Sequence, residues 1–190
     1  MIMIKKIDGF NKYIAIAGFK KVKIEDRDNL INTLQGRIQD GYIQFFNAKL
    51  ISGWEHLFFA ALNALKSFES KLNISNNLAI EMLLFASAQR QIKKAVKLLG
   101  IKSESSQIAI IIIAETKQRA SETLEMVSEL IFGERDDSVV ELSDEKYEAI
   151  KELFGISNLE FKSKLIRKGL ERSALIDLVI EHIALLATKR

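Results

Sequence analysis

Residues 107–115 read QIAIIIIAE, and the four consecutive isoleucines in this run restrict the fold more than any other stretch. β-Branched side chains favour extended backbone. An apolar run without alternating polar residues is typical of a strand that is covered on both faces. The run therefore predicts a central strand whose sheet has helices on each side.

Other strand and helix signals alternate along the chain, with no repeat and no linker rich in Gly, Ser or Pro. Strands are predicted over 13–24 (two short ones around Gly18), 42–52 and 139–142. Helices are predicted over 28–38, 54–70, 77–88, 117–131, 143–155, 159–168 and 171–188. Asp28, Ser52 and Ser143 are the expected N-caps, and Gly133 and Gly155 the expected stops. The predicted class is α/β, with a small central β-sheet flanked by helices and a helical C-terminal end.

The composition favours one globular domain over residues 1–190. Of the 190 residues, 48% are hydrophobic, which is enough to bury a core. The absence of cysteine excludes disulfides and thiolate sites and favours a cytoplasmic protein. The longest apolar run, 108–114, is too short to span a bilayer, and residues 1–10 lack the apolar core of a secretory signal, so no membrane association is expected. A net charge of +3 is compatible with a polyanionic partner but does not identify one.

Residues 85–100, FASAQRQIKKAVKLLG, join an apolar approach and a polar hinge to a basic helix that stops at Gly100. At about 100° per residue, the helix has an apolar arc and an opposite, positively charged arc. The apolar arc holds Ile92, Ala95, Val96 and Leu99, and the charged arc holds Arg90, Lys93, Lys94 and Lys97. Gln89 and Arg90 are expected in the first turn, where unpaired backbone N–H groups favour an anion such as phosphate. The alternative, a charged face that is simply solvated, stays open on spacing alone.

The helix predicted over 171–188 is apolar over a wider arc than the stripe of about 100° that a surface helix usually needs. One apolar arc comprises Leu175, Leu178, Val179, His182, Leu185 and Leu186. A second comprises Ile176, Ile180, Ile183 and Ala187. Because large apolar patches are unusual in water, we expect a protein partner at Ile176, Val179, Ile180, Ile183 and Ala187. The alternative is that the helix over 159–168, with apolar Leu159, Phe161, Leu165 and Ile166, covers the second arc within the chain.

The remaining polar candidates do not predict catalysis or metal binding. His56 and His182 lack the spacing of a triad or a metal site, so a structural role is expected for both. Asp136 and Asp137 precede a predicted strand, where turn and cap chemistry is commoner than a cation site. Trp54 could stack on a base, but its place at a helix start favours partial burial. With no phosphate loop or nucleophile elbow in the sequence, we expect neither a cofactor nor an enzymatic activity.

Four segments in the same order carry a resemblance to a known family. The run SAQRQIKKAVKLLG, residues 87–100, resembles the S-G-Q-R-Q-I signature of the TPRKB-like proteins of archaea and eukaryotes, the kinase-binding regulatory subunits of the KEOPS complex. FGERDDSVVELSDEKYEAIKELFGI, residues 132–156, is similar to the family segment around its D-D-S strand. FFNAKLISGWEHLFFAALNAL, which includes His56 at a family position, and the closing ERSALIDLVIEHIALLATKR also resemble their family counterparts.

The resemblance implies a non-catalytic subunit of an assembly that makes threonylcarbamoyl-adenosine in tRNA. Its implied partners are the small RIO-like kinase subunit, docked on the C-terminal helix, and the single-stranded 3′ CCA end of tRNA. The implied RNA contacts are Ser87, Gln89, Arg90, Gln91 and Ile92, to which the basic arc adds Lys93 and Lys94. Ala88 stands where the family commonly has glycine, which puts any role needing positive φ in doubt. The isolated chain could also form a homodimer through the same apolar strip.

Two other function classes compete with this one. A small α/β enzyme would use Asp136, Asp137 or His56 in a site at the sheet edge, and those groups would have to converge in a concave pocket. A stand-alone RNA-binding domain would have a C-terminal helix covered wholly by its own chain. Neither class accounts for the ordered motifs.

Overall fold

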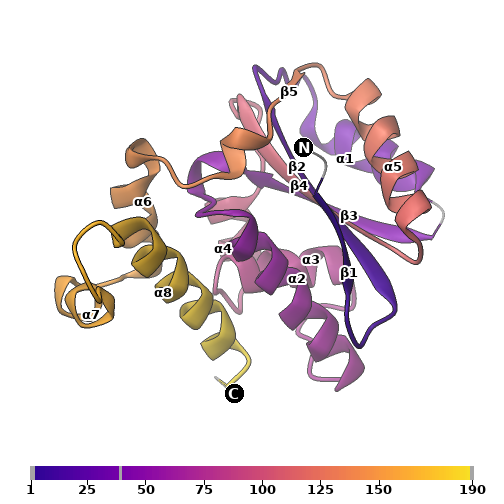
Figure 1. Ribbon diagram of the computed structural model, residues 1–190. Helices are drawn as coiled ribbons and strands as arrows, with labels where there is room; N and C mark the ends of the chain where they lie inside the picture. Colours follow the sequence, from indigo (N-terminus) through magenta and orange to yellow (C-terminus); the bar gives the residue numbers. More distant parts are fainter. Residues whose placement is uncertain (1–2, 39, 189–190) are drawn as a thin grey trace. The chain divides into compact units, whose positions relative to one another are not determined.

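The computed structural model describes residues 3–38 and 40–188 (Figure 1). The chain divides into two compact units, each built from two separate stretches of sequence. The sheet unit comprises Met1–Lys49 and Gly100–Val140, and the helical unit comprises Leu50–Leu99 and Glu141–Arg190. The predicted α/β class with a helical C-terminal end is confirmed, while the single domain over 1–190 stays a prediction.

The sheet unit contains an antiparallel sheet in the order β1-β2-β4-β3, where β4 is an interior strand. Its strands are β1 (Met3–Ile7), β2 (Lys12–Lys20), β3 (Gly41–Asn47) and β4 (Gln107–Ala114), with β5 (Glu134–Arg135) paired to β2. Successive residues of β4 from Ile108 onward are all buried, which confirms the prediction of a strand covered on both faces. The hairpin partner β1 was not predicted, because its five residues carry a weak strand pattern.

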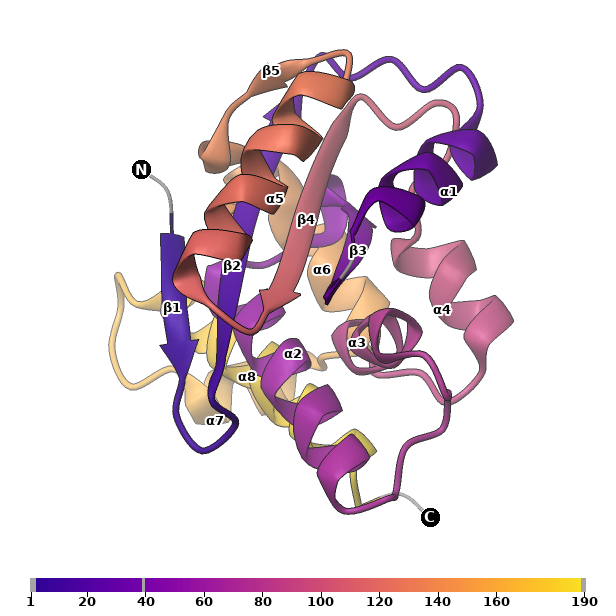
Figure 2. The same cartoon turned by 90° about the vertical axis from the view of Figure 1, so that its right-hand side faces the viewer.

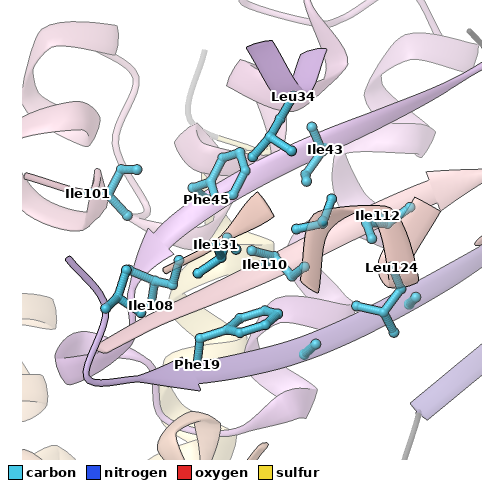
Figure 3. Packing of buried hydrophobic residues seen from close by; sticks show 14 of the residues in the cluster. Phe19, Leu34, Ile43, Phe45, Ile101, Ile108, Ile110, Ile112, Leu124 and Ile131 are labelled. Carbon is cyan, nitrogen blue, oxygen red and sulfur yellow. The ribbon is translucent and has the colours of Figure 1, made fainter. Parts of the chain in front are cut away.

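Two helices, α1 (Arg27–Arg37) and α5 (Lys117–Leu130), cover one face of this sheet (Figure 2). Figure 3 shows Leu34 of α1 next to Ile43 and Phe45, and Leu124 of α5 near Ile112 on the side of β4 that faces β2. Burial of these side chains stabilises the unit by roughly 1.5 to 3 kcal/mol for each large apolar residue. The face therefore supplies a sizeable hydrophobic core.

Several predicted boundaries in the sheet unit are wrong for local reasons. Residues 12–20 form one strand through Gly18, where an added Cβ would lie 2.5 Å from Val139 Cγ2. The predicted strand at 139–142 is instead a 3-10 helix, η2 (Asp137–Val140), since Asp136 accepts from the Ser138 N–H and turns the chain. Asp26, not Asp28, caps α1, and α5 ends at Leu130 before Gly133.

The helical unit contains six α-helices among its described residues. They are α2 (Trp54–Glu69), α3 (Leu78–Ala86), α4 (Ile92–Leu99), α6 (Asp144–Phe154), α7 (Asn158–Lys164) and α8 (Glu171–Leu186). α8 packs on α2, α3, α6 and α7 (Figure 1). The predicted stop at Gly155 is confirmed by its left-handed backbone at φ +66°. Ser52 does not cap α2 as predicted, because Gly53 occupies the cap position and Ser52 contacts His56.

Candidate nucleic-acid and partner interface

The C-terminal end of α3 is closed by a Schellman motif. The Gln89 N–H donates to Leu84 O at 3.0 Å, and the Ala88 N–H donates to Phe85 O at 2.9 Å. Ala88 sits at the left-handed position with φ +49°, so the chain keeps this conformation without the glycine that favours it. The doubt raised by Ala88 over positive φ is therefore resolved: the conformation is present.

Ser87 does not offer its hydroxyl to a ligand. The side chain is buried, and its Oγ donates to Leu83 O at 2.8 Å. The Ser87 hydroxyl is thus used to pair a carbonyl group at the end of α3, and an RNA contact of Ser87 stays a prediction. Ser87 supports the segment that follows it.

The segment after α3 presents an exposed basic strip, defined here as Arg90, Gln91, Ile92, Lys93 and Lys94. The helix α4 begins only at Ile92, and Gln91 O accepts from the Ala95 N–H at 3.0 Å, so Gln89 and Arg90 precede the helix and do not lie in its first turn as predicted. Ile92 is 43% exposed, although it was predicted on the apolar core arc; Ala95 and Leu99 are buried as predicted. The strip thus combines three cations with one exposed aliphatic side chain.

A groove in the helical unit shares Arg90, the first residue of this strip. Its volume is about 430 Å³, and Arg90 is part of its lining. Lys66 adds a second cation and Asn63 an amide, while the apolar lining comes from Leu72, Ile74, Phe85 and Leu186. We call this the α2–α3 groove. It joins Arg90 with Ala187, two residues that the sequence assigned to different partners.

The wall of the α2–α3 groove is held by Glu81, which is buried. Its carboxylate accepts from the backbone N–H groups of Ile74 and Ser75 and from the Ser67 hydroxyl. Sequence reasoning missed Lys66 and Glu81, because only the packing of α2 beside α3 brings them to Arg90. No local pattern in the sequence signals that arrangement.

The histidines have structural roles, as expected. His56 is fully buried, its Nε2 lies 2.8 Å from Ala86 O, and its Nδ1 lies 3.2 Å from the Ser52 nitrogen. Burial, with a smaller contribution from the charge of nearby Lys146, lowers the pKa of His56 to about 4, so the ring is neutral at pH 7. Nε2 is then the donor to Ala86 O, and Nδ1 accepts from the Ser52 N–H. His182 lies 2.9 Å from Glu160 Oε1 and joins α8 to α7.

The helix α8 has a covered side and an open side. Val179 and Ile183 are fully buried, so they cannot contact a partner while this packing is kept, contrary to expectation. Ile176 and Ile180 are half-buried, and Ala187 is exposed. Leu185 is 49% exposed, although it was placed on the covered arc. An open apolar strip of Ile176, Ile180 and Ala187 therefore remains on α8, and Leu185 is exposed on another side of the helix.

The segment around α7 covers α8 only in part. Leu159 and Ile166 are 80% and 91% exposed, whereas Phe161 and Leu165 are half-buried. Two polar pairs join the helices, His182 with Glu160 and Lys164 with Glu181. Of the four apolar residues expected to cover the second arc, Leu159 and Ile166 therefore do not do so.

The carboxylates of Asp136 and Asp137 form hydrogen bonds and ion pairs that stabilise their own loop. Asp136 accepts from Lys20 Nζ at 2.7 Å and from Ser138, and these hydrogen bonds lower its pKa to about 2. Asp137 accepts from the Gly18 N–H and contacts Arg135. Among the residues that the structure describes, no group of three or more His, Asp or Glu could hold a metal ion, and no helix is long and apolar enough to cross a membrane. Trp54 is half-buried and packs edge-on against Phe58.

The sequence of the chain is similar to those of known proteins. A sequence model of the family described as "Kinase binding protein CGI-121" matches residues 19–187, which include the basic strip, the α2–α3 groove and α8. The chain is also similar to "Regulatory protein Cgi121" of Methanocaldococcus jannaschii. The two are 33% identical over 135 residues, which are 71% of this chain and 83% of that protein.

Proposed function

The chain belongs to the CGI-121 family of kinase-binding proteins, and from this premise we propose that it is a regulatory subunit that holds a kinase and an RNA end and performs no chemistry itself. The proposed kinase is the small RIO-like subunit of the KEOPS complex. The proposed RNA is the 3′ CCA end of tRNA, in support of threonylcarbamoyl-adenosine modification. Both proposed surfaces lie on the helical unit, and Ala187 of the predicted kinase surface also lines the groove proposed for RNA.

The RNA proposal is supported chiefly by the continuity of the basic strip with the α2–α3 groove. Single-stranded RNA is bound by cations that follow its backbone and by side chains against which its bases pack. Arg90, Lys93 and Lys94 supply the charge, and Gln91 supplies amide hydrogen bonds that can meet base edges. The groove adds Lys66 and an apolar wall of a volume suited to a nucleotide.

The kinase proposal is supported by the open apolar strip on α8. Ile176 and Ile180 are half-buried and Ala187 is exposed, on a helix that also packs on α2 and α3. A partner that covers this strip would remove apolar surface from water, which stabilises the complex by about 25 cal/mol for each Å² buried. Holding kinase and RNA together raises the effective concentration of the tRNA body near the rest of the assembly.

Binding of tRNA with and without its CCA end tests the RNA proposal. Wild type should bind the intact tRNA at least tenfold more tightly than the shortened one, a difference of about 1.4 kcal/mol. Arg90→Glu should lose that preference, and Lys162→Glu, a matched charge reversal on exposed α7, should keep it. Equal binding of both tRNAs by wild type would remove the RNA assignment.

Co-purification with the kinase tests the second surface. Ile180→Arg should abolish capture of the kinase without unfolding the chain, because it places a charge in the apolar strip. Ala149→Arg is the matched control, since Ala149 is an exposed alanine on α6, away from the strip in sequence. Capture by Ile180→Arg at the wild-type level would place the kinase elsewhere.

A further inference from the structure

The last four carbonyl groups of an α-helix have no partner within the helix, and in α3 all four are paired. Leu83 O accepts from the Ser87 N–H, Leu84 O from the Gln89 N–H, and Phe85 O from the Ala88 N–H. The backbone N–H groups of residues 87–89, which follow the helix, thus pair with three of these four carbonyl groups. The fourth, Ala86 O, is paired with a residue that lies 30 positions earlier in the sequence.

That fourth partner is His56 on α2, at 2.8 Å from Nε2 to the carbonyl oxygen. The ring is itself fixed at its other nitrogen by the Ser52 N–H at 3.2 Å, and at its face by Phe154, whose ring centroid is 5.6 Å away. Ala86 is fully buried, so without His56 its carbonyl oxygen would be an unpaired acceptor inside the protein. Of these four hydrogen bonds, only the one from His56 ties the end of α3 to another helix.

The basic strip begins four residues after Ala86. The chain leaves α3 through the left-handed Ala88, a conformation that an alanine adopts only when its surroundings hold it. A shift of the Ala86 peptide would rotate the following turn and displace Arg90 from the α2–α3 groove. We propose that His56 is a positioning residue for RNA binding, which acts by locking the end of α3 and so sets the direction of the basic strip. This inference rests on the proposed RNA-binding function.

Two substitutions of His56 separate positioning from simple stability. His56→Gln can extend an amide N–H to Ala86 O, whereas His56→Asn reaches the Ser52 side of the site but is too short for Ala86 O. Ile150→Ala, which removes a fully buried side chain on α6, is the control for lost stability. The measurements are amide hydrogen exchange at Ala88 and Gln89, affinity for tRNA ending in CCA, and affinity for the kinase.

We expect His56→Asn to speed exchange at Ala88 and Gln89 and to weaken tRNA binding roughly tenfold, with kinase affinity unchanged. His56→Gln should restore most of both properties. Ile150→Ala should leave tRNA affinity near wild type, although it lowers stability. If His56→Asn fails to fold, His56→Gln is compared with Ile150→Ala in tRNA affinity and in amide exchange. Only a positioning role predicts that His56→Gln preserves both tRNA affinity and slow exchange.

The outcomes distinguish this inference from the function on which it rests. If wild type binds tRNA and His56→Asn binds equally well, or if Ile150→Ala weakens binding as much, positioning by His56 is wrong and the RNA proposal stands. If wild type binds no tRNA, the RNA proposal fails and positioning for RNA fails with it. The exchange data would then still report whether His56 locks the end of α3.

Discussion

The Oε2 atom of Glu81 lies 2.8 Å from the backbone nitrogen of Ser75, inside the helical unit. The same carboxylate accepts from the Ile74 N–H at 3.1 Å and from the Ser67 hydroxyl at 3.1 Å. One buried side chain therefore attaches the connection between α2 and α3 to the first turn of α3. That connection carries Leu72 and Ile74, which form the wall of the α2–α3 groove.

Glu81→Gln should destabilise the chain by about 2 to 3 kcal/mol, because an amide group would meet backbone N–H donors where an ionised acceptor now lies. Urea unfolding measures the loss. Glu69→Gln, at an exposed position on α2, should change the free energy of unfolding by less than about 0.5 kcal/mol. Equal stability of the two variants would show that Glu81 does not hold the groove wall.

Ala88→Gly should stabilise the chain by about 1 kcal/mol, since glycine adopts the left-handed conformation at φ +49° without the cost that alanine meets there. Ala149→Gly, at an exposed position inside α6, should destabilise by a similar amount. Urea unfolding should therefore give a higher midpoint for Ala88→Gly and a lower midpoint for Ala149→Gly, as the Schellman motif requires. A loss of stability in Ala88→Gly would contradict it.

The stability of the chain should fall as the pH drops from 6.5 toward 4, because His56 is held neutral. Its folded pKa of about 4 lies below the unfolded value of 6.5, so the unfolded chain binds more protons across this window. The contribution is fully present above pH 6.5 and amounts to about 3 kcal/mol. Lys146, which also faces the ring, stays charged in this range.

Carboxylates titrate in the same window, so the measured quantity is the difference between wild type and His56→Gln. Wild type should lose free energy of unfolding relative to His56→Gln as the pH approaches 4. A pH-independent difference would mean that His56 takes up its proton as readily in the folded chain as in the unfolded one.

Arg90→Gln should lower the salt dependence of tRNA binding. Each phosphate contact with a single strand contributes about 0.7 to the slope of log affinity against log salt concentration. Loss of the Arg90 contact should reduce the slope by about that amount, and Lys162→Gln should leave it unchanged. An unaltered slope in Arg90→Gln would argue against a phosphate contact at this residue.

The sequence predicted the elements whose signals are local. The unbroken isoleucines of β4 predicted a strand buried on both faces, and Gly155 predicted the end of α6. The two adjacent valines at 139–140 were misleading, because the turn at Asp136 and the close approach to Gly18 outweigh their preference for extended backbone. Local propensity failed where a contact distant in sequence decides the conformation.

The basic strip was predictable, and the groove beside it was not. Arg90, Lys93 and Lys94 are close in sequence, and their charge is visible there. Lys66 lies 24 residues before Arg90, and Leu72 was not singled out by any pattern, so only the packed helices reveal that they share a groove. Ser87 fitted the motif but is buried, because the same hydroxyl that marks the signature is used to close α3.

The most direct test of RNA capture by the helical unit is photocrosslinking with a tRNA whose terminal adenine carries an azide. The crosslinked residues, mapped by mass spectrometry, should fall within 63–74 and 85–94, which contain the α2–α3 groove and the basic strip. Crosslinking should disappear in Arg90→Glu. Crosslinks confined to the strands and helices of the sheet unit would contradict the account.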